Sequence, residues 1–394
     1  MGDKITKSPQ IRFAGFTDAW EQRMLGEISE KVTEKNKNNI YSETLTNSAE
    51  FGIINQRDFF EKDISNEKNL NGYYVVRSDD FVYNPRISNS APVGPIKRNK
   101  LGRTGVMSPL YYVFRTHDVD KTYLEKYFTS NYWHKFMKLN GDSGARSDRF
   151  AIKDSLFREM PIPIPSIEEQ TKIGNYFEQL EDLITLHQRK LELLEDTKKS
   201  LLQKMFPKDG ANVPEIRLAG FTDAWEQRKL GEITQIKTGS SDLQDAVGDG
   251  EYPFFVRSEN IERSNRWIFD GEAILIPGEG RIGEIFHYIN GKFDYHQRVY
   301  KISNFTDSVT DGKYILYYMQ RNFKRHALKF TVKATVDSLR LPMLTEFEVV
   351  LPSLEEQRKV SAIFSHLDNL ITLHQRELDS LRNLKKLLLQ QMFI

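Results

Sequence analysis

The 394-residue sequence contains no cysteine, which excludes disulfide bonds, thiol nucleophiles and cysteine-ligated zinc sites. It has no apolar run near the ~18 residues that a membrane-spanning helix needs, and its opening MGDKITKSPQ lacks the apolar core of a signal peptide. No glycine-rich loop followed by Lys-Ser/Thr is present, so nucleotide hydrolysis has no recognisable site. These absences favour a cytoplasmic protein with no membrane contact.

Histidines and carboxylates give no clear catalytic or metal centre. His287, Asp294 and His296 could be arranged as metal ligands or as an acid–base pair, but the eight histidines are scattered through the chain. A structural or solvated role is the simpler interpretation of residues spread in this way. We therefore predict that the chain is not an enzyme and has no metal site and no cofactor of its own.

What the sequence does contain is an internal duplication. The ten residues AGFTDAWEQR occur at 14–23 and again, unchanged, at 219–228. The surrounding segments 9–28 and 214–233 differ at only three of their 20 positions. Chance does not produce such a repeat, so the chain consists of two related halves.

A second pair of similar segments closes the halves, at 165–206 and 352–393. The intervening residues 29–160 and 234–348 show no comparable similarity. A chain of this length is too long for one ordinary core. The duplication therefore predicts two modules whose opening and closing segments, together termed the frame, are alike, whereas the residues between these segments differ.

Each closing segment predicts a long helix. Ser166 and Glu169 have the spacing of a capping box, as do Ser353 and Glu356. Apolar residues then recur with the alternating four–three spacing of a coiled-coil seam. A pseudo-twofold relation between the halves would make the two helices antiparallel. The predicted seam contains Ile173, Phe177, Leu180, Ile184, His187 and Leu191 in the first helix, and Val360, Phe364, Leu367, Ile371, His374 and Leu378 in the second.

Two polar residues interrupt both seams at equivalent places, His187 with His374 and Lys198 with Lys385. We interpret the histidines as polar residues that set the register of the helices. Further leucines lie off the seam, where a two-helix contact does not need them. They either pack against the chain's own modules or form a surface for partner helices. These leucines are Leu183, Leu186, Leu193, Leu370, Leu373 and Leu384.

The divergent middles predict an α+β fold for each module. Strand-like runs lie at 72–77, 110–115, 273–277 and 299–303, and amphipathic helices are expected at 123–139 and 314–330. The predicted division is a first module at 1–165, a long helix at 166–206, a second module at 207–351 and a second long helix at 352–394.

Positive charge is segregated in both modules. Residues 81–117 and 312–336 contain no aspartate or glutamate but several bases. One acid-free window in each module favours two electrostatic footprints for a polyanion, such as double-stranded DNA; the alternative is a solubilising basic loop. The predicted DNA contacts are Arg86, Lys97, Arg98, Lys100 and Arg103, Arg146 and Arg149 from the loop that follows, and Arg321, Lys324, Arg325, Lys329 and Lys333.

Arginines are preferred among these residues because a guanidinium can bind guanine through two hydrogen bonds. Arg86, Arg103, Arg146 and Arg325 are therefore the favoured base contacts. Lys333 falls opposite Arg146 when the halves are matched through Pro165 and Pro352.

The order module, helix, module, helix resembles that of the DNA specificity subunit of type I restriction-modification systems. The motifs PEIRLAGFTDAWEQRKLGEI and LPSLEEQRKVSAIFSHLDNLITLHQRELDSLRNLKKLLLQQMF carry the resemblance, which covers essentially the whole chain. It implies two target recognition domains that read the halves of an asymmetric, interrupted DNA site. It also implies an antiparallel coiled coil that sets their spacing.

The same resemblance implies partner proteins. Two methyltransferase subunits would dock on the coiled coil, and restriction/translocase subunits would join the assembled complex. S-adenosylmethionine, ATP and magnesium would then be bound by those partners and not by this chain.

Two alternatives come from other functional classes. A coiled-coil regulator, such as a repressor, would bind a specific DNA site without partner subunits. A single-chain nuclease or methyltransferase would be active on its own with magnesium or S-adenosylmethionine.

Overall fold

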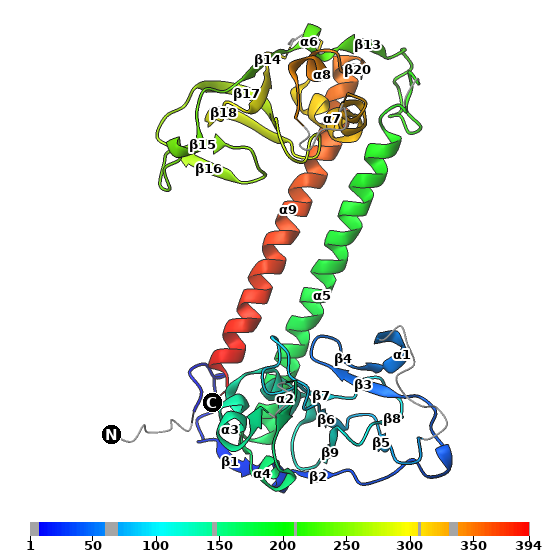
Figure 1. Cartoon of the computed structure of the whole chain (residues 1–394), viewed down its shortest axis with the longest axis vertical. Coiled ribbons are helices and arrows are strands. Elements are labelled where there is room, and N and C mark those ends of the chain that lie inside the picture. Colours follow the sequence, from blue (N-terminus) through cyan, green and yellow to red (C-terminus); the bar gives the residue numbers. More distant parts are fainter. Residues whose placement is uncertain are drawn as a thin grey trace. The chain divides into compact units, whose positions relative to one another are not determined.

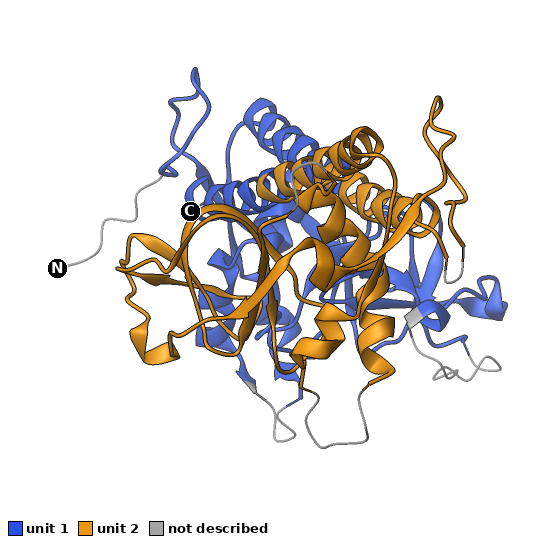
Figure 2. Cartoon of the chain, turned by 90° about the horizontal axis from the view of Figure 1, so that it is seen from above, with its two compact units in different colours: residues 1–186, 377–394 blue, residues 187–376 orange. Residues whose placement is uncertain are grey.

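The computed structural model describes residues 8–59, 70–143, 148–208, 211–305, 309–330 and 338–393. The chain forms two compact units (Figure 2). Unit 1 comprises residues 1–186 and 377–394, and unit 2 comprises residues 187–376. Each unit therefore contains one divergent module together with one part of each long helix.

Unit 1 is an α+β module in which β2, β9, β6 and β7 form an antiparallel sheet in that order (Figure 1). Two-stranded pairs β3–β4, β5–β8 and β10–β11 surround it. The elements are β1 (Glu21–Met24), β2 (Ser29–Lys31), β3 (Leu45–Ser48), β4 (Gly52–Asn55), α1 (Gln56–Phe59), β5 (Tyr74–Val76), β6 (Phe81–Tyr83), β7 (Ile96–Arg98), β8 (Gly105–Met107), β9 (Tyr112–Thr116), α2 (Lys121–Thr129), α3 (Tyr132–Asn140), β10 (Asp142–Ser143), β11 (Phe150–Ala151), α4 (Asp154–Arg158) and β12 (Pro161–Ile164).

Unit 2 contains a larger sheet of six strands in the order β14-β19-β17-β18-β15-β16, in which only β15 and β18 are parallel. The long α7 packs against β17 of this sheet. The elements are β13 (Glu226–Lys229), α6 (Leu230–Ile233), β14 (Gln235–Thr238), β15 (Tyr252–Phe255), β16 (Ile261–Ser264), β17 (Phe269–Pro277), β18 (His287–Tyr295), β19 (Val299–Ser303), α7 (Gly312–Leu328), α8 (Leu341–Thr345) and β20 (Glu348–Leu351).

The two closing segments form the helices α5 (Ile167–Lys204) and α9 (Leu354–Gln391), each of 38 residues. The serine half of each predicted capping box is present, whereas the glutamate side chains bind arginines instead. Ser166 Oγ accepts the backbone N–H of Glu169 at 3.3 Å, and Ser353 Oγ accepts that of Glu356 at 3.3 Å. Among the described residues, no helix combines the length and the apolarity needed to cross a membrane.

The two helices run antiparallel in each unit. In unit 1, Glu181 of α5 binds Lys385 of α9 at 2.8 Å, and in unit 2, Lys198 binds Asp368 at 2.6 Å. Of the twelve predicted seam residues, Ile184, His187 and Ile371 are half-buried, and the structure buries the others. The apolar seam thus holds the helices together over both units.

The off-seam leucines are not covered by the chain's own modules. Leu183, Leu186, Leu193, Leu373 and Leu384 are between 39% and 66% exposed, and Leu370 is half-buried. Packing against the chain's own modules, one of the two interpretations given above, therefore does not account for these leucines in the described residues.

The ends of the long helices complete the cores of the modules. Phe206, just after α5, stacks on Phe364 in unit 2 with ring centroids 5.6 Å apart. Phe393, just after α9, stacks on Phe177 in unit 1 at 6.0 Å. Both phenylalanines are almost fully buried. The repeated Met-Phe that ends each closing segment is therefore a core element.

In each unit the repeated opening segment pairs with the strand that precedes a long helix. β1 runs antiparallel to β12, with Glu21 opposite Ile164. β13 runs antiparallel to β20 in the same way, with Glu226 opposite Leu351. The opening and closing segments, which are distant in the sequence, thus meet in one strand pair in each unit.

An arginine of the same opening segment binds the start of each helix. Arg12 makes two hydrogen bonds of 2.7 Å to the Glu169 carboxylate, and Arg217 makes bonds of 2.9 and 2.8 Å to Glu356. The two carboxylates are 0% and 1% exposed. Hydrogen bonding to Glu169 raises the pKa of Arg12, and hydrogen bonding to Glu356 raises that of Arg217.

The residue after each glutamate, a glutamine, connects the long helix to the helix of the module. Gln170 Oε1 accepts the backbone N–H of Asp120, the N-cap of α2, at 2.8 Å. Gln357 Oε1 accepts that of Asp311, the N-cap of α7, at 2.9 Å. The same hydrogen bond between a long helix and the helix of its module therefore occurs in both units, although the module sequences do not align.

The predicted helix at 123–139 is wrong in one respect, because the structure divides it into α2 and α3. The Ser130 hydroxyl donates to the Tyr127 carbonyl at 2.6 Å, and the Trp133 indole donates to the carbonyls of Phe128 and Ser130 at 3.2 and 3.0 Å. These side chains satisfy carbonyls that a continuous helix would use itself. The helix expected at 314–330 is α7, and the expected strands correspond to β5, β9, β17 and β19.

We predict that Arg12→Ala destabilises the protein by about 3 kcal/mol, because it leaves the Glu169 carboxylate buried without its partner. Calorimetry should show a lower Tm, and hydrogen exchange should accelerate in β1 and at the start of α5. Arg23→Ala is the matched control, since that guanidinium makes an exposed hydrogen bond to the Glu27 carbonyl. Equal Tm values for the two variants would contradict a structural role for the Arg12–Glu169 pair.

Candidate functional site

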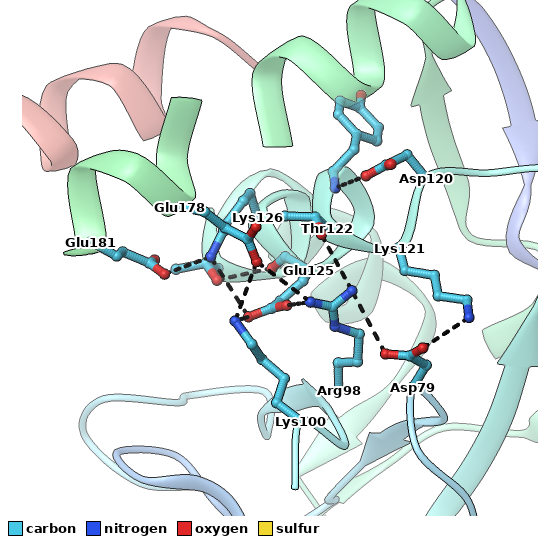
Figure 3. A network of polar contacts seen from close by, with 12 residues as sticks. Asp79, Arg98, Lys100, Asp120, Lys121, Thr122, Glu125, Lys126, Glu178 and Glu181 are labelled. Atoms are coloured by element: carbon cyan, nitrogen blue, oxygen red, sulfur yellow. Dashed lines mark hydrogen bonds and ion pairs between the residues drawn. The ribbon is translucent and has the colours of Figure 1, made fainter. Parts of the chain in front are cut away.

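The basic window of module 1 is largely engaged with carboxylates from other segments (Figure 3). Arg98 lies 2.8 Å from Glu125 of α2 and 3.8 Å from Glu178 of α5. Lys100 lies 3.5 Å from both carboxylates. Arg98 and Lys100 therefore attach the sheet to the helices, and this engagement weakens the argument that they bind DNA.

A buried lysine forms the other half of this network. Lys126 is 1% exposed and lies 2.7 Å from Glu181, which also binds Lys385. Burial by itself raises the pKa of Glu181, but hydrogen bonds from both lysines outweigh it, so the pKa lies below its usual value. Burial lowers the pKa of the neighbouring Lys97.

Unit 2 has an equivalent network at the positions that the repeat predicts. Asp368 of α9 accepts hydrogen bonds from Tyr317 of α7 at 2.8 Å and from Lys198 of α5 at 2.6 Å. The seam lysines are thus partners of acids on the opposite helix. In both units a carboxylate on a long helix joins the other helix and the module.

Arg103 is also paired. Its guanidinium makes two hydrogen bonds of 2.8 Å to Glu43, which hold the pKa of that carboxyl below its usual value. Glu43 lies outside the acid-free window. The contact is exposed, so DNA phosphates can compete with Glu43 for Arg103. Binding DNA would nevertheless require Arg103 to leave this carboxylate.

Arg86 and Arg149 differ from these residues, because the fold brings them together and leaves them exposed. They form an isolated antiparallel bridge between two segments, supported by hydrogen bonds from Phe150 N–H to the Pro85 carbonyl at 2.7 Å and from Ile87 N–H to that of Asp148 at 3.1 Å. Among the described residues, neither arginine has a carboxylate within 4 Å.

A cavity of about 690 Å³ adjoins this pair of arginines. Its lining includes Pro85 and Phe150, the direct neighbours of the two arginines in the sequence, and Tyr83, Tyr112 and Phe157. Two exposed guanidinium groups beside an aromatic hollow have the chemistry to contact phosphates and base edges. We regard this region as the candidate nucleic-acid interface of module 1.

In module 2 the predicted basic residues Arg321, Lys324 and Arg325 lie on α7, and Lys329 is its C-cap. Lys324 binds Glu284 at 2.5 Å, while Arg325 and Lys329 are exposed. Arg321 lines two adjoining hollows of about 480 and 620 Å³, together with Lys198. Its Nε is buried and has no hydrogen-bond partner among the described residues.

Two of the predicted contacts, Arg146 and Lys333, lie outside the described residues. Both residues stay predictions.

Asp294 and His296 make hydrogen bonds to neighbouring groups of the protein. Asp294 is fully buried and accepts hydrogen bonds from the hydroxyls of Ser241 and Ser264 at 2.5 and 3.2 Å and from Arg266 at 3.2 Å. His296 accepts the backbone N–H of Arg298 through Nδ1 at 2.9 Å.

The residues that sequence reasoning missed belong to the frame. Arg12 and Arg217 lie at equivalent places in the opening segments, and their partners Glu169 and Glu356 lie at equivalent places in the closing segments. A basic and an acidic residue that persist together in both copies were the available signal. Lys126 gave no such signal, because its equivalent in unit 2 is Tyr317.

The known proteins that this chain resembles are specificity subunits of type I restriction systems. The family model described as type I restriction modification DNA specificity domain matches residues 17–196 and 222–383. The EcoDI specificity subunit of a type I restriction enzyme from Escherichia coli is 33% identical over 147 residues, which cover 37% of this chain and 31% of that protein. The MjaVIII specificity subunit from Methanocaldococcus jannaschii is 25% identical over 263 residues, 60% of this chain and 61% of that protein.

The aligned part of each relative is thus less than two thirds of its length. Among solved structures, the S subunit of a type I restriction-modification system from M. genitalium has the same fold. It is 15% identical, with a TM-score of 0.65 over 98% of this chain and 99% of that one.

We predict that Glu181→Gln lowers the Tm at neutral pH, because it leaves the buried Lys126 without its closest carboxylate. The pKa of Glu181 is depressed in the folded state, so its charge stabilises the protein above the ordinary carboxyl pKa of about 4.3. That contribution is lost as the pH falls through the lower, folded pKa. The Tm difference between variant and wild type should therefore shrink below about pH 4. A pH-independent difference would contradict the charge-based account.

Proposed function

Because the chain belongs to the family of type I restriction-modification DNA specificity domains, we propose that it is a specificity subunit that reads a bipartite, interrupted site in double-stranded DNA. The observation that carries this proposal is the combination of one frame with two different contents. The Arg–Glu closure recurs in both units, whereas unit 1 has a four-stranded sheet and unit 2 a six-stranded one. Two unlike modules on like frames suit the reading of two unlike half-sites.

We assign the DNA contacts of module 1 to Arg86 and Arg149, together with Arg146, which lies outside the described residues. In module 2, the candidates are the exposed basic residues of α7 and Lys333. An arginine that reads guanine makes two hydrogen bonds to its major-groove edge, whereas contacts to phosphates fix the position of the protein. Arg98, Lys100 and Arg103 rank lower, because carboxylates already engage them.

Docking of partner subunits is supported by the exposed leucines on the long helices. Leu183 and Leu186 of α5 in unit 1 occupy the same positions of the repeat as Leu370 and Leu373 of α9 in unit 2. Leu186 is 60% exposed and Leu373 is 49% exposed. Two equivalent apolar surfaces suit two copies of one partner, here a methyltransferase subunit.

In the proposed complex, the chemistry is carried out by the partners. Methyltransferase subunits would bind S-adenosylmethionine and methylate adenine at N6, and restriction subunits would use ATP and magnesium. This chain would place them at its DNA site without a cofactor of its own. A repressor-like regulator would instead form a specific DNA complex alone, and a single-chain enzyme would be active without partners.

We predict that Arg86→Ala or Arg149→Ala relaxes or weakens recognition of one half-site only, by about 5- to 150-fold per lost base contact. Arg146→Ala should affect the same half-site. Binding is measured by titrating the assembled complex with duplexes altered in either half. Arg23→Ala, on the frame, is the control and should leave both half-sites unaffected. Equal losses at both half-sites, or none, would remove these residues from the interface.

We predict that Leu186→Ser combined with Leu373→Ser reduces co-purification of methyltransferase subunits at least tenfold while the Tm changes little, because both side chains are exposed. Ile261→Ser, at an equally exposed apolar residue of β16, is the matched control. Unchanged co-purification would place the docking surface elsewhere on the chain.

A further inference from the structure

Two histidines face each other across the helix pair in unit 2. His187 of α5 and His374 of α9 have their Nδ1 atoms 3.2 Å apart and their ring centroids 5.3 Å apart. His374 is buried and His187 is half-buried. The two residues are 187 positions apart and are equivalent in the repeat, so each copy of one motif supplies one imidazole.

This separation is the one that two ligands of a single metal ion require. Nitrogens bound to Zn²⁺ at about 2.0–2.1 Å in tetrahedral geometry lie roughly 3.3–3.4 Å apart. An alternative use of two facing Nδ1 atoms is a shared hydrogen, in which one ring donates and the other accepts. Both arrangements need the same approach of the rings, and they differ in whether an ion or a proton lies between the nitrogens.

Glu377 is a carboxylate on the same helix as His374. It follows His374 by three residues in α9, a spacing that places both side chains on one face. The imidazoles of His187 and His374 lie within unit 2, and Glu377 lies one helical turn beyond His374 in the continuous α9. Two imidazoles and a carboxylate are a donor set for zinc and similar ions, whereas magnesium and calcium prefer oxygen ligands.

We propose that His187 and His374 bind one divalent transition-metal ion of the zinc class, with Glu377 as the third ligand and water completing the coordination. The ion links α5 to α9 and fixes their register, a role that the sequence suggested for the histidines without a metal. The site is structural, and it neither requires nor supports the proposed DNA recognition. Because imidazole binds a metal only when it is neutral, acid competes with the ion.

The test titrates the full-length chain, first treated with a chelator, with Co²⁺. We expect one saturable Co²⁺ per chain with visible d–d absorption, displaced by Zn²⁺, and weaker binding at pH 5 than at pH 7. Saturating Zn²⁺ should raise the Tm by about 2–5 °C, since a ligand bound only to the native state stabilises it. Mg²⁺ should have no such effect.

His187→Gln and His374→Gln should each reduce Co²⁺ affinity at least tenfold and abolish the Zn²⁺-dependent rise in Tm. Glu377→Gln should reduce affinity by a smaller factor. His366→Gln is the matched control, because His366 lies exposed on the same α9 and should be replaceable without effect. Helical content from circular dichroism verifies that each variant is folded.

Two results would overturn the proposal. One is the absence of saturable Co²⁺ binding and of a Zn²⁺-dependent Tm rise in the wild-type chain, which decides the matter even if a variant fails to fold. The other is binding that is equal in wild type, His187→Gln and His374→Gln. Either result leaves the shared hydrogen as the role of the pair.

Discussion

The structure depends on a buried ion pair that closes each half of the chain. Arg12 and Glu169 are 157 residues apart, and Arg217 and Glu356 are 139 apart, yet each pair meets through two hydrogen bonds at the start of a long helix. A carboxylate removed from water is tolerated only when a cation and hydrogen bonds replace its hydration. The closure therefore forms only when the opening strand, the last strand of the module and the helix are all in place.

This constraint separates what can vary from what cannot. Everything between the opening and closing segments is free to change, provided that its ends return to the same strand pair and its helix is capped beside Gln170 or Gln357. The modules use that freedom fully, since their sheets differ in strand number and order. This arrangement suits the proposed function, in which equivalent surfaces meet identical partners while the two modules read different sequences.

The long helices belong to both units, which gives the frame a second constraint. Phe206 completes the core of unit 2 and Phe393 that of unit 1, so neither module has its full core without the end of a long helix. The acid–lysine pairs Glu181–Lys385 and Lys198–Asp368 add directional contacts to the apolar seam. They favour one register, because a shifted helix would leave charges half-buried without partners.

The sequence was sufficient to predict the duplication, the two long helices and their seam, because these features are periodic and local. It was not sufficient for the break between α2 and α3, where Ser130 and Trp133 take over carbonyls in a segment whose amphipathic period continues unbroken. The acid-free window at 81–117 also suggested more unpaired basic residues than the fold contains. Residues 81–117 contain no acid, but Glu43, Glu125 and Glu178 reach Arg103, Arg98 and Lys100 from elsewhere in the fold.

The central claim is that two unlike modules on one repeated frame read two separate DNA elements. Selection of bound duplexes from a random pool, with the chain purified together with the partners that remain attached, tests it most directly. The account predicts two short, different motifs separated by a spacer of fixed length and unrestricted sequence. A single contiguous motif, or no enrichment by a complex that retains its methyltransferase subunits, would contradict it.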